Sequence, residues 1–249
     1  MTSIERRPLG GVEAGEALSE EAAVLSKLLA DRYSCRAYRP DPVPRPVIEQ
    51  MLQIAQMAPS WCNSQPWRVS VTEGAATERF RQALHTRAAE DLSKGEPPQD
   101  EGDFPFPAAY NGVYRERRRE VGWQLYESVG VAFGDRVASA KQTLENFRLF
   151  GAPHMLLVTT ERDLGVYGAI DCGVYVGALV LAAQSLGIGM IPQAALAMYG
   201  KFMREFFEIP DDRLIVLGAS FGYPDPTHPA NSFRSRRAPV GDAVTWLGD

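Results

Sequence analysis

Two basic residues and a hydroxyl group alternate along one short segment of the chain, which reads Arg32-Tyr33-Ser34-Cys35-Arg36. In an extended backbone every second side chain lies on the same face, so Arg32, Ser34 and Arg36 would form one row. Guanidinium groups and a hydroxyl can bind a phosphate monoester through charge-assisted and bidentate hydrogen bonds. The spacing therefore favours a phosphate site, although a solvated, salt-bridged loop accounts for the same residues.

A second group of polar and aromatic residues follows about twenty-five positions later, where a helix is expected to end and a strand to begin. It reads Pro59-Ser60-Trp61-Cys62-Asn63-Ser64-Gln65-Pro66-Trp67. Small polar groups and backbone amides crowded in this way can hydrogen-bond a planar heterocycle while the aromatic rings bound its plane. The alternative is an ordinary Asn/Ser/Pro turn with Trp67 in the core.

Other common chemical motifs are missing from the sequence. Gly187-Ile188-Gly189 follows a helical pattern and leads to Pro192, so it is no dinucleotide fingerprint. The cysteines and histidines have neither disulfide nor metal-ligand spacing, and we assign them no metal. They are Cys35, Cys62, Cys172, His85, His154 and His228. For Cys35 and Cys62 we expect small buried side chains, with a reactive thiol as the alternative.

The elements that must position these groups can be read from hydrophobic periodicity. Six helices are expected, at Glu20–Ala30, Pro46–Met57, Thr77–Leu92, Tyr114–Glu127, Arg136–Phe150 and Lys201–Phe207. Three strands are expected, at Arg68–Thr72, Met155–Thr160 and Leu214–Phe221. This order of elements suits an α+β sandwich better than regular βαβ alternation.

The segment Ile170–Ile191 is apolar enough to be mistaken for a membrane span. Asp171 and Gln184 within it, and the early Gly187 and Pro192, argue against a span. We expect instead a fully buried central helix of a soluble protein, apolar on nearly every side.

The chain of 249 residues, 45% hydrophobic with a formal net charge of -5, can bury a core without disulfides. That charge gives no global field for nucleic acid or an anionic membrane. No signal peptide is recognised, so a reducing cytoplasm is expected. We expect a mobile arm at residues 1–18 and a single domain at 19–249. That domain would carry a helical insertion at about 95–134 and an extended arm at about 224–249.

The two polar groups together, separated by one amphipathic helix, resemble the nitroreductase family of FMN-dependent oxidoreductases. That family opens with Arg-x-Ser-x-Arg or Lys and continues with a helix ending in Pro-Ser, then Asn-x-Gln-Pro-Trp. The similarity continues after the apolar helix, after the last strand and at Arg237-Ala238-Pro239. It implies an α+β fold, a central, mostly antiparallel sheet flanked by helices, and an intertwined homodimer.

The resemblance also implies roles for individual residues. Arg32, Ser34, Arg234 and Arg237 would serve the FMN phosphate, and Arg36 would reach the pyrimidine edge of the isoalloxazine, where its charge stabilises the reduced flavin. The remaining residues implied at the flavin form two stretches. Pro59, Ser60, Trp61 and Asn63 would come from the partner subunit, while Pro192, Gln193 and Ala194 would line the flavin face near N5 through backbone groups.

Three departures from the family pattern bear on substrate choice. Trp61 replaces an often small residue and, with Cys62, would border the substrate pocket or pack in the dimer interface. Gln193-Ala194 stands where many relatives carry Glu-Gly. Ser235 replaces the usual basic residue before Arg237. A basic run, Arg115, Arg117, Arg118 and Arg119, would lie near the flavin or NAD(P)H phosphates or form a solvated helix face.

The resemblance implies an enzyme that passes electrons from NADH or NADPH through FMN to a small organic acceptor such as a nitroaromatic or quinone, with ping-pong kinetics. The same scaffold also suits reductive dehalogenation, flavin fragmentation or ring dehydrogenation. A flavin-binding protein without turnover is a further alternative.

Overall fold

The structure, a computed structural model, describes residues 18–95 and 102–248. The chain forms two compact units. One unit holds the residues up to Asp31 together with Arg234–Asp249, and the other runs Arg32–Phe233. All of the expected N-terminal arm except its last residue lies outside the described residues.

The smaller unit contains one helix, α1 (Glu20–Asp31), where periodicity predicts a helix at Glu20–Ala30. The Ser19 hydroxyl accepts a hydrogen bond from the Ala22 N–H at 3.2 Å, as expected of an N-terminal cap. No residue of α1 is buried, and Leu25 and Leu29 are half exposed. The C-terminal stretch of this unit contains a 3-10 turn, η6 (Val240–Asp242).

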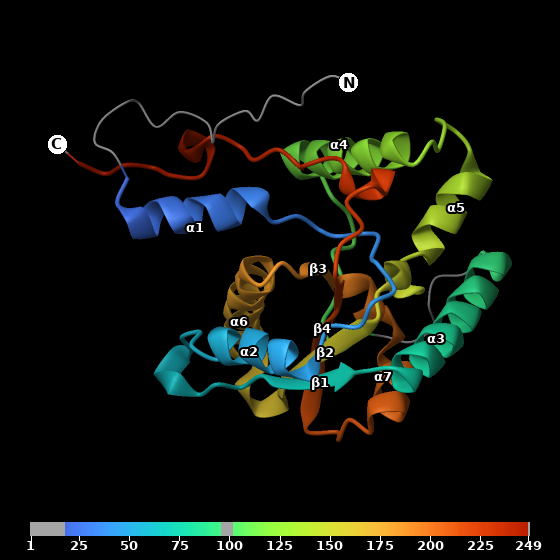
Figure 1. Cartoon of the computed structure of the whole chain (residues 1–249), viewed down its shortest axis with the longest axis horizontal. Helices are drawn as coiled ribbons and strands as arrows, with labels where there is room; N and C mark the ends of the chain where they lie inside the picture. The colour runs from blue at the N-terminus through green and yellow to red at the C-terminus, as the bar shows by residue number, and fades with distance from the viewer. Residues whose placement is uncertain (1–17, 96–101, 249) are drawn as a thin grey trace. The chain divides into compact units, whose positions relative to one another are not determined.

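The larger unit is built on a four-stranded antiparallel sheet with the order β1-β2-β4-β3 (Figure 1). Its strands are β1 (Arg68–Thr72), β2 (His154–Glu161), β3 (Gly189–Gln193) and β4 (Arg213–Gly222). The three predicted strands are confirmed as β1, β2 and β4. The short strand β3 was not predicted, because most of its residues were included in the apolar segment Ile170–Ile191 that was expected to form a helix.

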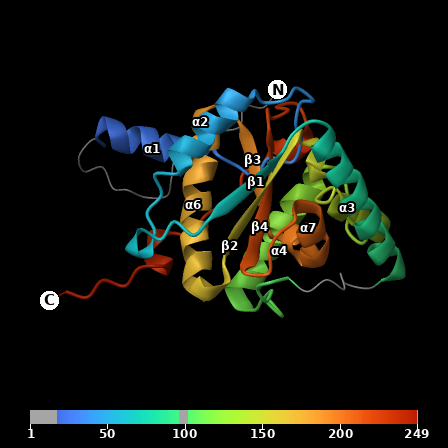
Figure 2. The same cartoon turned by 90° about the horizontal axis from the view of Figure 1, so that it is seen from below.

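Helices cover both faces of this sheet (Figures 1 and 2). Helices α2 (Arg45–Ala55) and α6 (Gly165–Ser185) lie on one side, and α3 (Ala75–Lys94) and α7 (Gly200–Phe207) on the other. Leu156 and Val158 of β2 pack in the first core, whereas Met155 and Leu157 pack in the second. This period-two alternation between two buried faces gives the expected α+β sandwich.

Two further helices precede β2, namely α4 (Gly112–Ser128) and α5 (Arg136–Leu144). The prediction of a helix at Arg136–Phe150 is wrong beyond Leu144. Leu149, Phe150 and Gly151 have φ of 59°, 52° and 76°, which turns the chain toward β2. Apolar residues at helical spacing continue through this turn, so periodicity did not show where helix α5 ends.

The apolar segment of Ile170–Ile191 divides between two elements. Helix α6 ends at Ser185, and Gly187, with φ of 72°, leads into β3. Helix α6 is long and apolar enough to cross a membrane, but one face packs into the first core. The prediction that it is buried on nearly every side is wrong for this chain, because Val166, Ile170 and Val174 are exposed on its other face.

Candidate functional site

The Arg32–Arg36 segment lies along the edge of β3. Ser34 forms a parallel bridge with Met190, and the Cys35 N–H donates to the Met190 carbonyl at 3.3 Å. A Cβ atom on Gly189 would lie 2.8 Å from the Cys35 Sγ, so glycine permits this close approach. Cys35 is buried while Ser34 and Arg36 are partly exposed. The predicted alternation is therefore seen in the burial of Ser34, Cys35 and Arg36, whereas Tyr33 is partly exposed like Arg32.

The Arg36 side chain is held in a partly buried position. Its Nη1 donates to the Ser34 carbonyl at 3.2 Å, and its guanidinium lies over the Phe233 ring at 5.9 Å. The buried Asn231 side chain accepts from the Arg36 N–H at 2.8 Å and donates to the Ala37 carbonyl at 2.9 Å. Burial lowers the pKa of Arg36 from its ordinary value, but arginine stays charged at neutral pH. The segment thus presents a preorganised cation.

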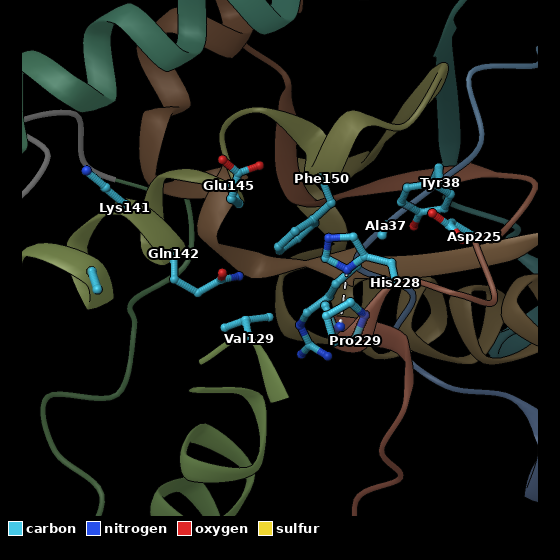
Figure 3. A pocket seen from close by; sticks show the side chains of 13 residues that line it. Ala37, Tyr38, Val129, Lys141, Gln142, Glu145, Phe150, Asp225, His228 and Pro229 are labelled. Atoms are coloured by element: carbon cyan, nitrogen blue, oxygen red, sulfur yellow. Dashed lines mark hydrogen bonds between the residues drawn. The ribbon is translucent and has the colours of Figure 1, made fainter. Parts of the chain in front are cut away.

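A cavity of about 600 Å³ opens beside Arg36 (Figure 3). In Figure 3 the side chains of Gln142 from α5 and Glu145 just after it lie on one side, and those of Asp225 and His228 lie on the other. Hydrogen bonds from the Thr227 hydroxyl and N–H lower the pKa of Asp225. The volume suits a small organic ligand or one part of a larger cofactor.

The sequence did not reveal the residues that line this cavity from α5 and its C-terminal end. Lys141, Gln142 and Glu145 were read only as part of a helix, and His228 was assigned no chemistry. The available signal was that Lys141 and Gln142 lie four and three positions before Glu145, spacings that bring side chains together on a helix. That signal cannot distinguish a cavity wall from a solvated face without the fold.

The second polar group forms a tight turn, η1 (Trp61–Asn63), between α2 and β1. Three non-glycine residues, Cys62, Asn63 and Gln65, have φ of 51°, 56° and 46°, in the left-handed region. The Gln65 N–H donates to the Ser60 hydroxyl at 2.9 Å, which closes the turn. These residues are exposed, so the turn is open to a ligand or a partner.

The aromatic and thiol side chains around this turn have different environments. Trp67 is buried and stacks on Tyr175 with ring centroids 4.9 Å apart, as the simple turn alternative expects. Trp61 is 57% exposed and packs edge-on against Tyr167. Cys62 is exposed, so its expected burial is wrong, whereas Cys35 is buried as expected. Burial raises the pKa of the Cys35 thiol.

The turn is held at both ends by charged side chains of the larger unit. The Asp171 carboxylate of α6 accepts from the Trp61 N–H at 3.1 and 3.2 Å and from the Ser64 hydroxyl at 3.2 Å. Arg213, at the start of β4, donates to the Pro66 carbonyl at 2.9 Å.

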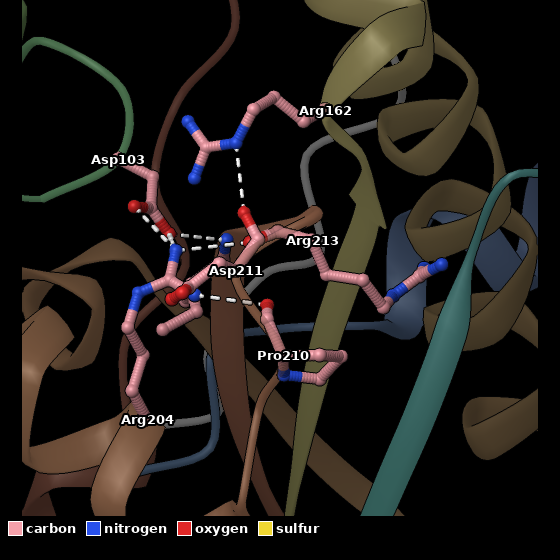
Figure 4. A network of polar contacts seen from close by, with 7 residues as sticks. Asp103, Arg162, Arg204, Pro210, Asp211 and Arg213 are labelled. Atoms are coloured by element: carbon pink, nitrogen blue, oxygen red, sulfur yellow. Dashed lines mark hydrogen bonds and ion pairs between the residues drawn. The ribbon is translucent and has the colours of Figure 1, made fainter.

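Arg213 borders a second polar network (Figure 4). Arg204 donates to both oxygens of Asp103 at 2.7 Å, and Asp103 also accepts from the Ile215 N–H at 2.6 Å. Asp103 precedes α4 in the sequence. Its bond to Ile215 fastens this segment to β4, next to the sheet irregularity at Val158/Thr159. This network fixes one end of the insertion.

The residues at the end of β3 differ in burial. Gln193 is buried, and its amide donates to the Asn146 carbonyl at 3.0 Å and accepts from the Ser220 hydroxyl at 2.5 Å. Pro192 is half-buried and Ala194 is exposed. The Gln193 side chain is therefore engaged in packing, and a ligand on the open face would meet Pro192, Ala194 and the backbone.

The other predicted residues lie outside this cluster or cannot be placed against it. Arg234 and Arg237 belong to the smaller unit, where Arg237 donates to the Ser235 hydroxyl at 2.8 Å. The basic run at 115–119 lies on the exposed face of α4, where Arg118 packs over the Tyr110 ring. Within residues 18–95 and 102–248, no cluster of His, Cys, Asp or Glu could hold a metal ion.

Comparison with known proteins gives consistent matches over most of the chain. A sequence profile described as "Nitroreductase family" matches residues 29–223. Nitroreductase NfnB of Mycolicibacterium smegmatis is 34% identical over 225 residues, covering 90% of this chain and 93% of that protein. A 4-nitrobenzoate reductase of Nocardioides sp. is 33% identical over 245 residues, covering 98% and 95%.

Solved structures agree with these matches. The crystal structure of the FMN-dependent nitroreductase NfnB from Mycobacterium smegmatis in complex with NADPH superposes with a TM-score of 0.84. It is 33% identical and covers 92% of this chain and 100% of its own. Iodotyrosine deiodinase bound to FMN and 3-iodo-L-tyrosine shares the fold, with a TM-score of 0.59 at 19% identity.

Proposed function

Because this chain belongs to the nitroreductase family, we propose that it is an FMN-dependent oxidoreductase that uses NAD(P)H to reduce nitroaromatic compounds. When bound, FMN accepts a hydride equivalent from the nicotinamide and passes electrons to the acceptor. The protein supplies binding, orientation and charge. The alternative functions for this scaffold are reductive dehalogenation, flavin fragmentation, ring dehydrogenation and flavin storage.

The row formed by Arg32, Ser34 and Arg36 carries this proposal. The segment is fastened to β3 by backbone bonds, so its hydroxyl and guanidinium groups are presented along one partly exposed edge. These groups match the donor set that a phosphate and the electron-rich edge of a flavin require. We propose that Arg32 and Ser34 bind the phosphate and that Arg36 lies at the pyrimidine edge.

The partly exposed Pro192 and the exposed Ala194 at the end of β3 support a second part of the flavin site. We propose that Pro192, Gln193 and Ala194 line the flavin face near N5. The Gln193 amide is already paired with Asn146 and Ser220, so its side chain supplies no acid or base there. Protons for the acceptor would come from water or from the acceptor itself.

We further propose that the enzyme works as a homodimer. The exposed face of α6 carries Val166, Ile170 and Val174. Ile54 of α2 and Met57 just after it are also exposed, Met57 at 84%. Helices α2 and α6 pack against each other, and we propose that these exposed residues belong to one apolar surface. A soluble protein covers such a surface, and a second copy would place its Trp61 turn at the neighbouring flavin.

In the dimer, Pro59, Ser60, Trp61 and Asn63 would reach the flavin of the partner, and Trp61 with Cys62 would border the acceptor pocket. Arg234 and Arg237 would add charge at the phosphate. Sedimentation of the FMN-bound protein tests the assembly: we expect a dimer mass, and a monomer that retains FMN contradicts it.

An anaerobic titration tests the activity. NADH or NADPH is added to the purified protein reconstituted with FMN, and the flavin absorbance is followed before and after adding 4-nitrobenzoate or nitrobenzene. We expect bleaching by the nicotinamide and recovery with the nitro compound. Bleaching without recovery points to one of the specialised chemistries, and no bleaching points to flavin storage.

A matched pair of variants connects this result to the site. Arg32→Ala should raise the FMN Kd because it removes a charged phosphate donor. Arg39→Ala is the control and should leave the FMN Kd unchanged, because Arg39 is an exposed arginine close by that packs on the Tyr223 ring. Equal FMN affinity in the two variants contradicts the phosphate assignment.

A further inference from the structure

The turn between α2 and β1 is held in an unfavourable backbone conformation. Cys62, Asn63 and Gln65 all have positive φ, although none is glycine. A left-handed conformation costs free energy at each such residue, and it persists only where the surroundings fix it. The contacts that fix this turn therefore control its shape.

A buried carboxylate makes the main contacts. Asp171 is 7% exposed, although it lies on the apolar helix α6. Its oxygens lie 3.1 and 3.2 Å from the Trp61 nitrogen, and one lies 3.2 Å from the Ser64 hydroxyl. The bonds come from Trp61 and Ser64, the residues on either side of Cys62 and Asn63.

The carboxylate and the turn depend on each other. A buried carboxylate is unfavourable unless hydrogen bonds replace its hydration. The hydrogen bonds observed for Asp171 come from Trp61 and Ser64, two residues of the turn. Relaxing the turn would leave this charge poorly solvated, so the charge favours the strained conformation.

We infer that Asp171 is a positioning residue of the flavin site, which holds the Ser60–Gln65 turn in the conformation that contacts FMN. The inference rests on the proposed function, in which Ser60, Trp61 and Asn63 lie at the flavin. Asp171 itself stays behind the turn, in the core of its own subunit, and acts through the Trp61 N–H and the Ser64 hydroxyl.

The test compares Asp171→Asn with Asp163→Asn. Both remove one negative charge, but Asp163 is exposed in the 3-10 turn before α6. FMN affinity is measured by quenching of flavin fluorescence on binding to the apoprotein, well below the unfolding temperature. We expect Asp171→Asn to raise the FMN Kd by about tenfold, the scale of a lost hydrogen bond to a charged group, and Asp163→Asn to leave it unchanged. A Kd of Asp171→Asn within twofold of the unsubstituted protein overturns the inference, even where its Tm falls.

Hydrogen exchange of the Trp61–Gln65 amides gives a second readout that needs no flavin. We expect faster exchange in Asp171→Asn than in Asp163→Asn, and equal exchange overturns the inference. If the unsubstituted protein fails to bind FMN, the proposed function fails, while the exchange measurement still decides what Asp171 does to the turn.

Ser64→Ala keeps the test valid where Asp171→Asn does not fold. This variant removes one donor to the carboxylate and leaves the Trp61 bonds in place. We expect a smaller rise in the FMN Kd, about threefold, with faster exchange of the Trp61 amide. No change in either quantity overturns the inference.

Discussion

Replacing Arg213 with methionine removes a buried cation while keeping an unbranched side chain of similar reach. The Arg213 side chain is 4% exposed. It donates to Glu161 at 2.6 Å, to the Thr159 hydroxyl at 2.8 Å and to the carbonyls of Thr159 and Pro66 at 2.9 Å each. One side chain therefore joins β2, β4 and the segment that leads into β1.

The expected loss of stability can be estimated contact by contact. Glu161 is 39% exposed, so water can solvate its carboxylate in the variant. Loss of the Arg213–Glu161 ion pair therefore lowers the free energy of unfolding by roughly 1 kcal/mol or less. The two buried carbonyls lose a charged donor, and an unsatisfied buried group costs about 1–3 kcal/mol. With about 1 kcal/mol for each carbonyl, the low end of that range, the sum with Glu161 is about 3 kcal/mol, at the lower end of the range for breaking a buried ion pair. For a chain of this size that corresponds to a Tm lowered by roughly 6–12 °C.

Thermal unfolding followed by circular dichroism measures this loss, with Arg162→Met as the control. Arg162 is exposed, and its side chain donates to the Asp211 carbonyl at 2.8 Å (Figure 4). We expect a change of about 0.5 kcal/mol or less for the control. If Arg213→Met lowers the Tm no more than Arg162→Met does, the estimate from buried contacts is refuted.

Three further predictions concern charge and protonation. Arg36→Ala should lower the reduction potential of bound FMN, because the Arg36 charge stabilises the reduced flavin. The shift is about 30 mV for each 1.4 kcal/mol by which the reduced flavin is destabilised, and an unchanged potential in a redox titration contradicts this. The His154 Nε2 accepts from the Val43 N–H at 2.9 Å, and burial lowers the pKa of His154, so the unfolded chain binds the proton more readily. Stability should therefore fall as the pH drops below about 6.5, and a His154→Gln variant with the same pH dependence in urea unfolding would contradict this. Burial raises the pKa of Cys172 to about 11, so iodoacetamide at pH 8 should alkylate the exposed Cys62 before Cys172. Mass spectrometry of the peptides measures the order, and alkylation of Cys172 first contradicts the prediction.

The fold was predictable wherever local pattern and tertiary structure agree. The limits of β1 follow from a short run with two valines bounded by proline, charge and glycine, and Arg68–Thr72 is found as predicted. Pattern failed where tertiary contacts determine the backbone. The left-handed turn at Leu149–Gly151 is held by Arg81, whose Nε donates to the Arg148 carbonyl at 3.1 Å. Arg81 lies 67 positions away in the sequence, so no local pattern could show this contact.

The candidate site was predictable to the extent that its residues are consecutive. Spacing alone placed Ser34 and Arg36 on one side of an extended segment and Cys35 on the other, as found. Spacing could not show that Gln193 points into the core, because its partner Asn146 comes from a different part of the chain. Spacing also could not show the contacts of Asp171 with the Trp61 turn. In the sequence Asp171 was only a charge in an apolar segment that argued against a membrane span.

The position of Pro192 in β3 has a consequence for aggregation. Strand β3 lies at the edge of the sheet, and its Met190 carbonyl points outward to Cys35. Residues two apart in a strand point the same way, so the Pro192 nitrogen also faces outward, where it has no hydrogen to donate. The first part of this edge is covered by Ser34 and Cys35, and the second part cannot donate to an added strand at Pro192. A short edge protected in this way resists recruitment into intermolecular β-sheet, which helps keep the folded protein soluble at high concentration.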